Sequence, residues 1–430
     1  MKIGYLHIGP PRHGVHRYGY LLAREASQRH DLTVIEVSVC LEATQQKNRQ
    51  LLMEAAQKLS EADIVHFQFT KFGDQLWGEG WLAWRHLRTF FEYCSSPIVV
   101  TLHDVYYQPY KLATVLSAVK ARLRRNASSL PSPSAGLTGN PKTSKDDFTS
   151  NYGPQPQRSR LAKGLNFTRV IIKGILGPEA MALREIATRA SQVIVCTEEE
   201  SRRIRDRIHS RKLQVIPHFV ETRSISTTSH QARKELNLEG VKVITLLGFI
   251  YPPKGHELLV EAMVNLPEEA MVIFAGGASS SPNEEFVQAL QILAKDLGVD
   301  HRLRITGYLS EEAMEQYLVA TDIAVCPFVR VSASGSLSTW ISVACPVLAS
   351  ESPQIEELSH LEPGAVATFR PYTPVALAEA ISKRVQEPQA PNRLAMERLR
   401  QKLLIPNILK QHTDLYRSVI NSRGREGTHE

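Results

Sequence analysis

The stretch Gly248-Phe249-Ile250-Tyr251-Pro252-Pro253-Lys254-Gly255 decides how the rest of the chain is interpreted. The apolar run 241–247 before it predicts a buried strand, and apolar residues recur at helical spacing over 258–263 after it. A strand, a loop and a helix in this order can hold an anion, because free N–H groups at a helix start and the Lys254 ammonium both attract phosphate. The plainer interpretation is a surface turn made by two prolines, with Lys254 solvated.

Length and composition indicate a globular protein of two domains. A chain of 430 residues is too long for one hydrophobic core, and 43% hydrophobic with 22% charged residues is ordinary for a soluble protein. No run approaches the roughly 18 apolar residues of a transmembrane helix, and residues 1–8 resemble a strand rather than a signal peptide. The 5 cysteines are far apart, which favours thiols in a reducing compartment over a disulfide framework or zinc site. We therefore expect a cytoplasmic protein without a metal.

The net charge of +7 belongs to one segment. Residues 107–173 contain twelve Lys or Arg and two Asp, and subtracting this balance of +10 from +7 leaves the remaining chain near −3. A protein that binds nucleic acid along its length would not have its basic residues confined to one segment, so we expect no nucleic acid as a partner. Within the segment, 110–125 has the pattern of a basic amphipathic helix and 126–160 that of a mobile loop. The helix has three interpretations: packing on its own domain, peripheral contact with an anionic membrane, or binding of a partner protein.

Strand and helix patterns alternate through both halves of the chain. The first half has predicted strands at 1–8, 32–39, 63–68 and 98–102, and the same alternation returns between residues 241 and 350. This pattern predicts parallel sheets with helices on both faces, in which ligands bind at the carboxyl ends of the strands. Gly14, His66 and His103 fall at or just beyond such ends.

We predict an α/β protein with two Rossmann-like, doubly wound domains facing a cleft. The first covers 1–220 and carries the basic, partly mobile insertion at about 107–173. The second covers 230–390. Residues 391–430 are predicted to be helices and a tail that return to the first domain.

The motifs occur in an order that resembles the GT-B-fold glycosyltransferases of family 4. The matching pieces are Arg12–Tyr18, Asp63–His66, Thr101–Asp104, Val215–His218, Gly248–Gly255, Ile305–Leu309 and Ser332–Ser350. Each piece alone is a weak signal, and the ordered set is a strong one. The resemblance implies a retaining glycosyltransferase that moves a sugar from a nucleotide-diphosphate sugar to the hydroxyl of a glycan, lipid-linked or small-molecule acceptor.

The same resemblance implies roles for individual residues. Lys254 would bind the diphosphate and His103 would lie near the transferred sugar. The implied donor-binding residues are Gly14, Tyr308, Ser332, Ser334, Gly335, Ser336 and Thr339. Such enzymes generally need no metal or cofactor, because side chains and helix starts meet the charge of the diphosphate.

Two departures from the family pattern keep a second hypothesis open. The phosphate loop lacks the family's arginine, since Gly248 and Tyr251 occupy the positions where it occurs. The paired glutamates of the family's E-x7-E segment are also absent, and Ser332 and Thr339 are the residues nearest to them. Arg330 lies close by as a substitute cation. The alternative function is a catalytically silent scaffold or regulatory subunit that binds a protein partner.

Overall fold

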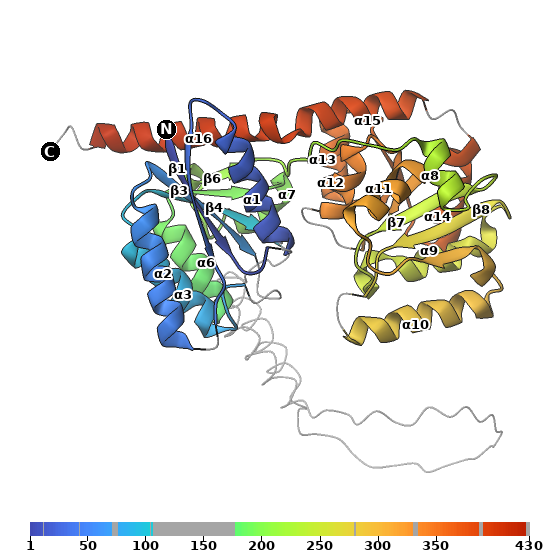
Figure 1. Cartoon of the computed structure of the whole chain (residues 1–430), viewed down its shortest axis with the longest axis horizontal. Helices are drawn as coiled ribbons and strands as arrows, with labels where there is room; N and C mark the ends of the chain where they lie inside the picture. Colours follow the sequence, from blue (N-terminus) through green and yellow to red (C-terminus); the bar gives the residue numbers. More distant parts are fainter. Residues whose placement is uncertain are drawn as a thin grey trace, which may run out of the picture.

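Two six-stranded sheets stand side by side in this computed structural model, each covered by helices (Figure 1). The structure describes residues 1–11, 13–42, 44–70, 76–103, 105, 177–278, 281–329, 334–386 and 390–426. The predicted insertion at 107–173, with its basic helix 110–125, lies outside the described residues, as do Arg12, Asp104, Arg330 and Ser332.

The first sheet has the strand order β2-β1-β3-β4-β5-β6, and all of its neighbouring strands are parallel. Its strands are β1 (Lys2–Ile8), β2 (Thr33–Val39), β3 (Ile64–Thr70), β4 (Ile98–His103), β5 (Gln192–Val195) and β6 (Leu213–Val215). The helices between them are α1 (Gly14–Ser27), α2 (Gln45–Leu59), α3 (Trp81–Tyr93), α6 (Pro178–Arg189), α7 (Glu198–Ile204) and the short η1 (Ser210–Lys212). We call this sheet with its helices the first domain.

The second sheet has the order β12-β11-β10-β7-β8-β9 and is parallel as well. Its strands are β7 (Lys242–Leu247), β8 (Ala270–Ala275), β9 (Leu303–Ile305), β10 (Ile323–Cys326), β11 (Val347–Ser350) and β12 (Val366–Phe369). Its helices are α8 (Ser229–Glu235), η2 (Pro252–Lys254), α9 (His256–Ala262), η3 (Met263–Asn265), α10 (Ser281–Asp296), η4 (Asp300–Arg302), α11 (Glu311–Ala320), α12 (Gly335–Ser342), α13 (Pro353–Leu361) and α14 (Pro374–Gln386). We call this unit the second domain.

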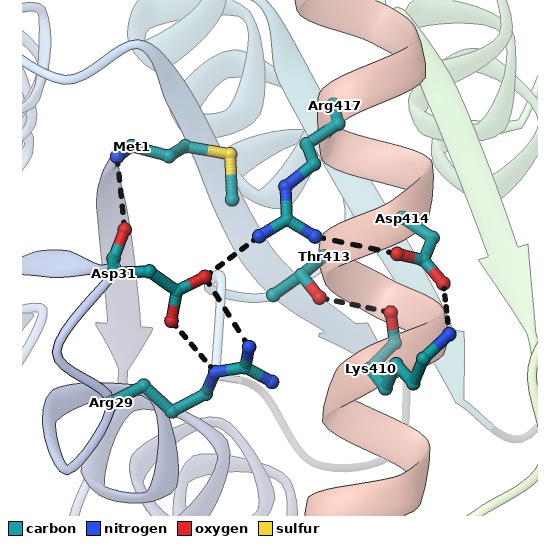
Figure 2. Close-up of polar contacts among 7 residues, drawn as sticks. All are labelled: Met1, Arg29, Asp31, Lys410, Thr413, Asp414 and Arg417. Atoms are coloured by element: carbon teal, nitrogen blue, oxygen red, sulfur yellow. Dashed lines mark hydrogen bonds and ion pairs between the residues drawn. The ribbon is translucent and has the colours of Figure 1, made fainter.

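Two C-terminal helices join the domains. α15 (Ala390–Leu403) lies on the second domain and α16 (Ile405–Glu426) crosses to the first, forming the long red rod of Figure 1. At the crossing, Val220 exchanges backbone hydrogen bonds with Leu403 and Ile405. Figure 2 shows how α16 is held further along: Arg417 donates to Asp31 at 2.8 Å and pairs with Asp414 at 3.4 Å.

The central strands β1, β3, β4 and β7 are mostly buried because helices cover both faces of each sheet, so alternation of polar and apolar residues is not required there. Every residue of β3 is buried, including the polar His66 and Gln68. The register pairs Thr70 with His103 at the carboxyl end of β3 and β4. Polar residues of neighbouring strands are therefore brought to one edge, where parallel sheets bind ligands.

The main differences from the predicted elements have local causes. The helical pattern of the sequence predicts a helix over 77–93, but α3 begins at Trp81, because Gly78 and Gly80 have φ values of +93° and +54° and keep the preceding residues out of the helix. α7, α13 and β12 are short elements that the pattern did not single out. Among the described residues, no helix is both long and apolar enough to span a membrane.

Candidate functional site

The loop 248–255 leaves β7 as a tight turn that two glycines make possible. Gly248 and Gly255 have φ values of +102° and +87°. A Cβ on Gly248 would lie 2.4 Å from Nζ of Lys254, so the missing side chain makes room for the ammonium group. A Cβ on Gly255 would lie 2.1 Å from the carbonyl oxygen of Pro327. The loop is thus packed against the chain that leaves β10.

Lys254 is buried rather than solvated. Its side chain lies between the rings of Tyr251 and Phe328, with Nζ 6.0 and 5.9 Å from their centroids, and the residue is 5% exposed. Nζ donates a hydrogen bond to Oγ of Ser336 at 3.0 Å. Burial lowers the pKa of Lys254 to about 8. No carboxylate of the described residues forms an ion pair with it, and a buried cation in that state favours an anionic ligand.

Ser336 belongs to the first turn of α12, which supplies further anion-binding groups. Ser334 caps this helix, and its Oγ accepts a hydrogen bond from the N–H of Leu337 at 3.3 Å. Gly335 has no neighbour within 4 Å of the place where a Cβ would be, so its backbone is open to a ligand. Thr339 instead donates its hydroxyl to the carbonyl of Gly335 at 2.9 Å. The first turn therefore combines free N–H groups, a helix dipole and Lys254.

Tyr308 lies beyond the end of β9 and is 85% exposed. The turn before it is held by Thr306, whose Oγ1 accepts from the N–H of Gly276 at 3.0 Å. A Cβ on Gly277 would lie 3.3 Å from the N atom of Tyr308. The loops that follow β8 and β9 are thus in contact, and the Tyr308 ring is free to stack on a planar group.

Gly14 is the first residue of α1, and it is exposed. His13 caps the helix by accepting from the N–H of Val15 through Nδ1 at 3.2 Å. Nothing lies within 4 Å of a Cβ placed on Gly14, so the glycine is not required by packing inside the chain. An open backbone at a helix start is what close approach of a ligand would use.

His103 ends β4 and is 7% exposed. Its Nε2 is hydrogen bonded to Oε1 of Gln68 at 2.9 Å, and the Tyr18 ring meets it edge-on at 4.9 Å between centroids. Burial, with His218 and His13 nearby, lowers the pKa of His103 to about 3. The imidazole is therefore neutral at ordinary pH.

The first turn of α12 brings the two halves of the site together. Oγ of Ser338 lies 3.3 Å from Nδ1 of His218, which follows β6 in the first domain. The His218 ring contacts the Tyr18 ring, with 4.8 Å between their centroids, and the same Tyr18 ring also contacts His103. Lys254 and His103 are thus connected through one helix start and two aromatic contacts.

A second contact between the domains involves charge. Arg17 of α1 pairs with Glu221 at 2.7 Å and lies 3.8 Å from Glu311 of the second domain. Arg223 bonds the same Glu311 at 3.1 Å. The carboxylates are therefore gathered at this contact, and burial lowers the pKa of the adjacent His218 while the charge of Glu221 opposes that shift.

Sequence reasoning gave no role to Gln68, Tyr18, His218, Ser338 and Arg17, although it placed some of them in motifs. Gln68 had a detectable signal, because His66 and Gln68 are polar residues at alternate positions of an otherwise apolar strand. Ser332, a predicted donor-binding residue, lies outside the described residues. Among the residues that the structure describes, no group of three or more His, Cys, Asp or Glu is placed to hold a metal ion.

Comparison with known proteins adds the family. Residues 241–387 match the family model described as Glycosyl transferases group 1. The second domain thus resembles group 1 glycosyl transferases over most of its length. Two curated D-inositol 3-phosphate glycosyltransferases are similar: that of Xylanimonas cellulosilytica is 31% identical over 85 residues, and that of Mycobacteroides abscessus is 35% identical over 97 residues. These matches cover 20% and 22% of this chain, and the chain spans only about a fifth of either relative, 20% and 21%.

Solved structures match over nearly the whole chain, which extends the likeness to the first domain. HepE of Anabaena, solved with UDP and glucose, is 16% identical with a TM-score of 0.63, covering 97% of this chain and 100% of that one. A sucrose-phosphate synthase from Thermosynechococcus elongatus is 18% identical with a TM-score of 0.62, covering 98% and 100%. At such identities the likeness shows the fold, and the prediction of two Rossmann-like domains in the GT-B arrangement is confirmed. The domain that carries the family match thus forms one half of a GT-B fold.

Proposed function

We propose that the protein transfers a sugar from a nucleotide-diphosphate sugar to a hydroxyl acceptor, with retention at the anomeric carbon and without a metal. The observation that supports this most is Lys254, a buried ammonium with no carboxylate partner among the described residues. A diphosphate between Lys254 and the first turn of α12 would supply the missing negative charge. HepE, whose fold this chain shares, was solved with UDP-glucose.

The remaining residues have roles consistent with this placement of the phosphates. Ser334, Gly335 and Ser336 would donate to phosphate oxygens, Gly14 would let the first domain approach the donor, and Tyr308 would contact the base. Thr339 lies one turn further along α12. His103 would receive a hydroxyl of the transferred sugar. The acceptor is proposed to be a glycan, a lipid-linked sugar or a small molecule.

The chemical step needs no protein nucleophile. The bond between the anomeric carbon and the diphosphate oxygen breaks, and its electron pair leaves with the nucleotide diphosphate. The acceptor oxygen forms its bond to the same face of the anomeric carbon and gives its proton to the leaving phosphate oxygen. Lys254 and the α12 start stabilise the charge that develops on the diphosphate. His103, neutral and held by Gln68, orients the sugar without contributing charge.

Screening for thermal stabilisation tests the function directly. UDP, GDP and ADP, and then their glucose conjugates, are added to the full chain, because a ligand that binds the folded state raises its melting temperature. We expect one nucleotide to give a clear shift, and the matching sugar donor to release nucleotide when acceptors are supplied. No shift with any nucleotide and no donor turnover would favour the scaffold or regulatory subunit instead.

A peripheral contact with anionic membrane through 110–125 is proposed separately, from the charge pattern of the sequence alone. Flotation with vesicles that contain or lack acidic lipid tests it. Recovery of the protein only with acidic vesicles at low salt is the expected result, and equal recovery without acidic lipid would contradict it.

A further inference from the structure

Buried polar side chains form a continuous hydrogen-bonded chain from α16 to His103. Nδ1 of His66 lies 2.7 Å from the hydroxyl of Tyr416, and Nε2 of the same ring lies 3.2 Å from Nε2 of Gln68. Oε1 of Gln68 lies 2.9 Å from Nε2 of His103. His66 and Tyr416 are fully buried and Gln68 is 6% exposed. The inner part of the chain, His66 and Tyr416, therefore lies out of contact with bulk water, and each group there depends on its protein partner.

The chemistry of Gln68 gives this chain a direction. An amide oxygen only accepts, so Nε2 of His103 must carry the proton that it donates. The amide nitrogen only donates, so Nε2 of His66 is an acceptor, which the hydroxyl of Thr101 also approaches at 2.8 Å. Nδ1 of His66 then carries its proton and donates to Tyr416. With the Gln68 amide in this orientation, the single lone pair on Nε2 of His66 is shared between the amide of Gln68 and the hydroxyl of Thr101.

The direction determines what His103 offers to a substrate. With its proton on Nε2, a neutral imidazole carries a lone pair on Nδ1. No hydrogen bond joins Nδ1 of His103 to another of the described residues. It differs from Nδ1 of His7, which is both fully buried and without a partner. In this tautomer Nδ1 is the nitrogen left to accept a hydrogen bond from a ligand.

We propose that Gln68 is a positioning residue that holds His103 in the tautomer with the proton on Nε2, so that Nδ1 accepts a hydrogen bond from a substrate hydroxyl. The consequence for catalysis rests on the proposed function, whereas the tautomer does not. An acceptor at this place selects a hydroxyl, which can donate, over an ether or a deoxy carbon, which cannot.

The surroundings keep this imidazole neutral. The groups that face His103 are Gln68 from β3, Tyr18 from α1, His13 before α1 and His218 after β6. None of them is a carboxylate, and the two histidines oppose a further positive charge, which agrees with its lowered pKa of about 3. Replacing Gln68 with Glu would put a carboxylate on Nε2 and reverse this preference.

Histidine-selective 15N NMR of the full chain tests the inference. The His103 signals are identified by their loss in His103→Asn. We expect a protonated Nε2 and an unprotonated Nδ1 in the wild type, and a mixture of tautomers in Gln68→Met, in which the acceptor is lost. Gln214→Met, on an exposed glutamine, is the matched control and leaves the His103 signals unchanged. A proton on Nδ1 in the wild type, or an unchanged tautomer in Gln68→Met, would overturn the proposal.

Gln68→Glu provides a second readout that a purely structural role would not move. In this variant His103 stays protonated on Nε2, but the new carboxylate raises the pKa of its imidazole. Protonation of Nδ1 then removes the acceptor, so the transfer rate should fall as the pH is lowered from about 8 to about 5. Gln68→Met is expected to lower the rate about tenfold with little change in nucleotide affinity. If Gln68→Met fails to fold, an unchanged pH profile in Gln68→Glu would still contradict the proposal. A protein with the predicted tautomer but no sugar transfer contradicts the proposed function and supports the tautomer.

Discussion

The two halves of the site treat charge in opposite ways. In the second domain the ammonium of Lys254 is buried with a hydroxyl and two aromatic rings around it, and no carboxylate pairs with it among the described residues. In the first domain His103 and His66 are buried as neutral rings whose hydrogen bonds are met by Gln68, Thr101 and Tyr416. The ammonium in the second domain lacks an anion, whereas the hydrogen-bonded chain from Tyr416 to His103 leaves Nδ1 of His103 as an acceptor. This difference is the basis on which we propose that the diphosphate binds to the second domain and neutral hydroxyl groups to the first.

The largest effect is expected from Lys254→Met, which removes the charge and keeps the volume. Nucleotide affinity should fall about 100-fold, because a charged hydrogen bond is worth about 1.5–3 kcal/mol. The apo protein should become more stable, because an unpaired buried cation is unfavourable. Calorimetric titration and thermal unfolding measure the two changes. Lys242→Met, on an exposed lysine of the same domain, should change neither. Nucleotide affinity within twofold of wild type in Lys254→Met would mean that the phosphates bind elsewhere.

The buried ammonium of Lys254 should also make the stability of the protein depend on pH. The pKa of Lys254 is lowered from 10.5 to about 8 in the folded protein, so between these values the unfolded chain binds more protons. The free energy of unfolding should therefore rise as the pH increases over this window, by roughly 3 kcal/mol if the whole pKa shift contributes. Below about pH 8 the destabilisation caused by the buried ammonium is fully present. Urea unfolding of wild type and Lys254→Met between pH 7 and about 10.5 isolates the contribution. Parallel curves for the two proteins would contradict it.

Two glycines of α1, Gly14 and Gly19, allow effects on donor binding and on stability to be measured separately in the first domain. Gly14→Ala adds a methyl group to open space and should leave the melting temperature unchanged, while nucleotide-sugar affinity falls about tenfold if the donor approaches this backbone. Gly19→Ala places its Cβ 2.9 Å from Nδ1 of His7 and should cost about 1–3 kcal/mol of stability. Equal donor affinity in Gly14→Ala and wild type would remove Gly14 from the site.

Two helix caps of the second domain offer a smaller contrast. Ser334 caps α12 and Ser352 caps α13, and each accepts from a backbone N–H three residues on. Replacing either with Ala should cost about 1 kcal/mol of stability. Only Ser334→Ala should also weaken nucleotide binding, by a few fold. Equal nucleotide affinities in the two variants would show that the α12 start does not hold phosphate through this hydroxyl.

The smallest effect is expected at the surface contact of Figure 2. Arg417 is 44% exposed and Asp31 is 47% exposed, so solvent screens their ion pair and it contributes little to stability. Arg417→Ala should shift the urea midpoint slightly at low salt and not at high salt. Tyr416→Phe, one residue away, breaks the buried bond to His66 and should cost more, about 1 kcal/mol. A larger loss in Arg417→Ala would mean that the charged contact, not the buried one, attaches α16.

The sequence predicts the fold well because its signals are local. Periodicity of 2 or 3.6 and the glycines and prolines between elements are enough to place most strands and helices in order. The site is harder, because its properties depend on distant residues. Lys254 resembles a solvated turn residue until Ser336, 82 positions later, and Phe328 are seen to cover it.

Gln68 illustrates the same limit in the first domain. Its position in a strand is predictable, but its role depends on His103, which is 35 residues away, and on the neighbouring His66, which is bonded to Tyr416, 350 residues away. A polar residue within a strand that is buried on both faces signals that a partner must exist. Which partner it has follows only from the parallel register of β3 and β4 and from the return of α16.

The most direct test of the contrast between the two halves is calorimetric titration of Lys254→Met and His103→Asn with the nucleotide that stabilises the wild type most. We predict that Lys254→Met loses about 100-fold in affinity, whereas His103→Asn binds the nucleotide within a few fold of wild type. Comparable losses in both variants, or a loss only in His103→Asn, would contradict the assignment of the diphosphate to the second domain.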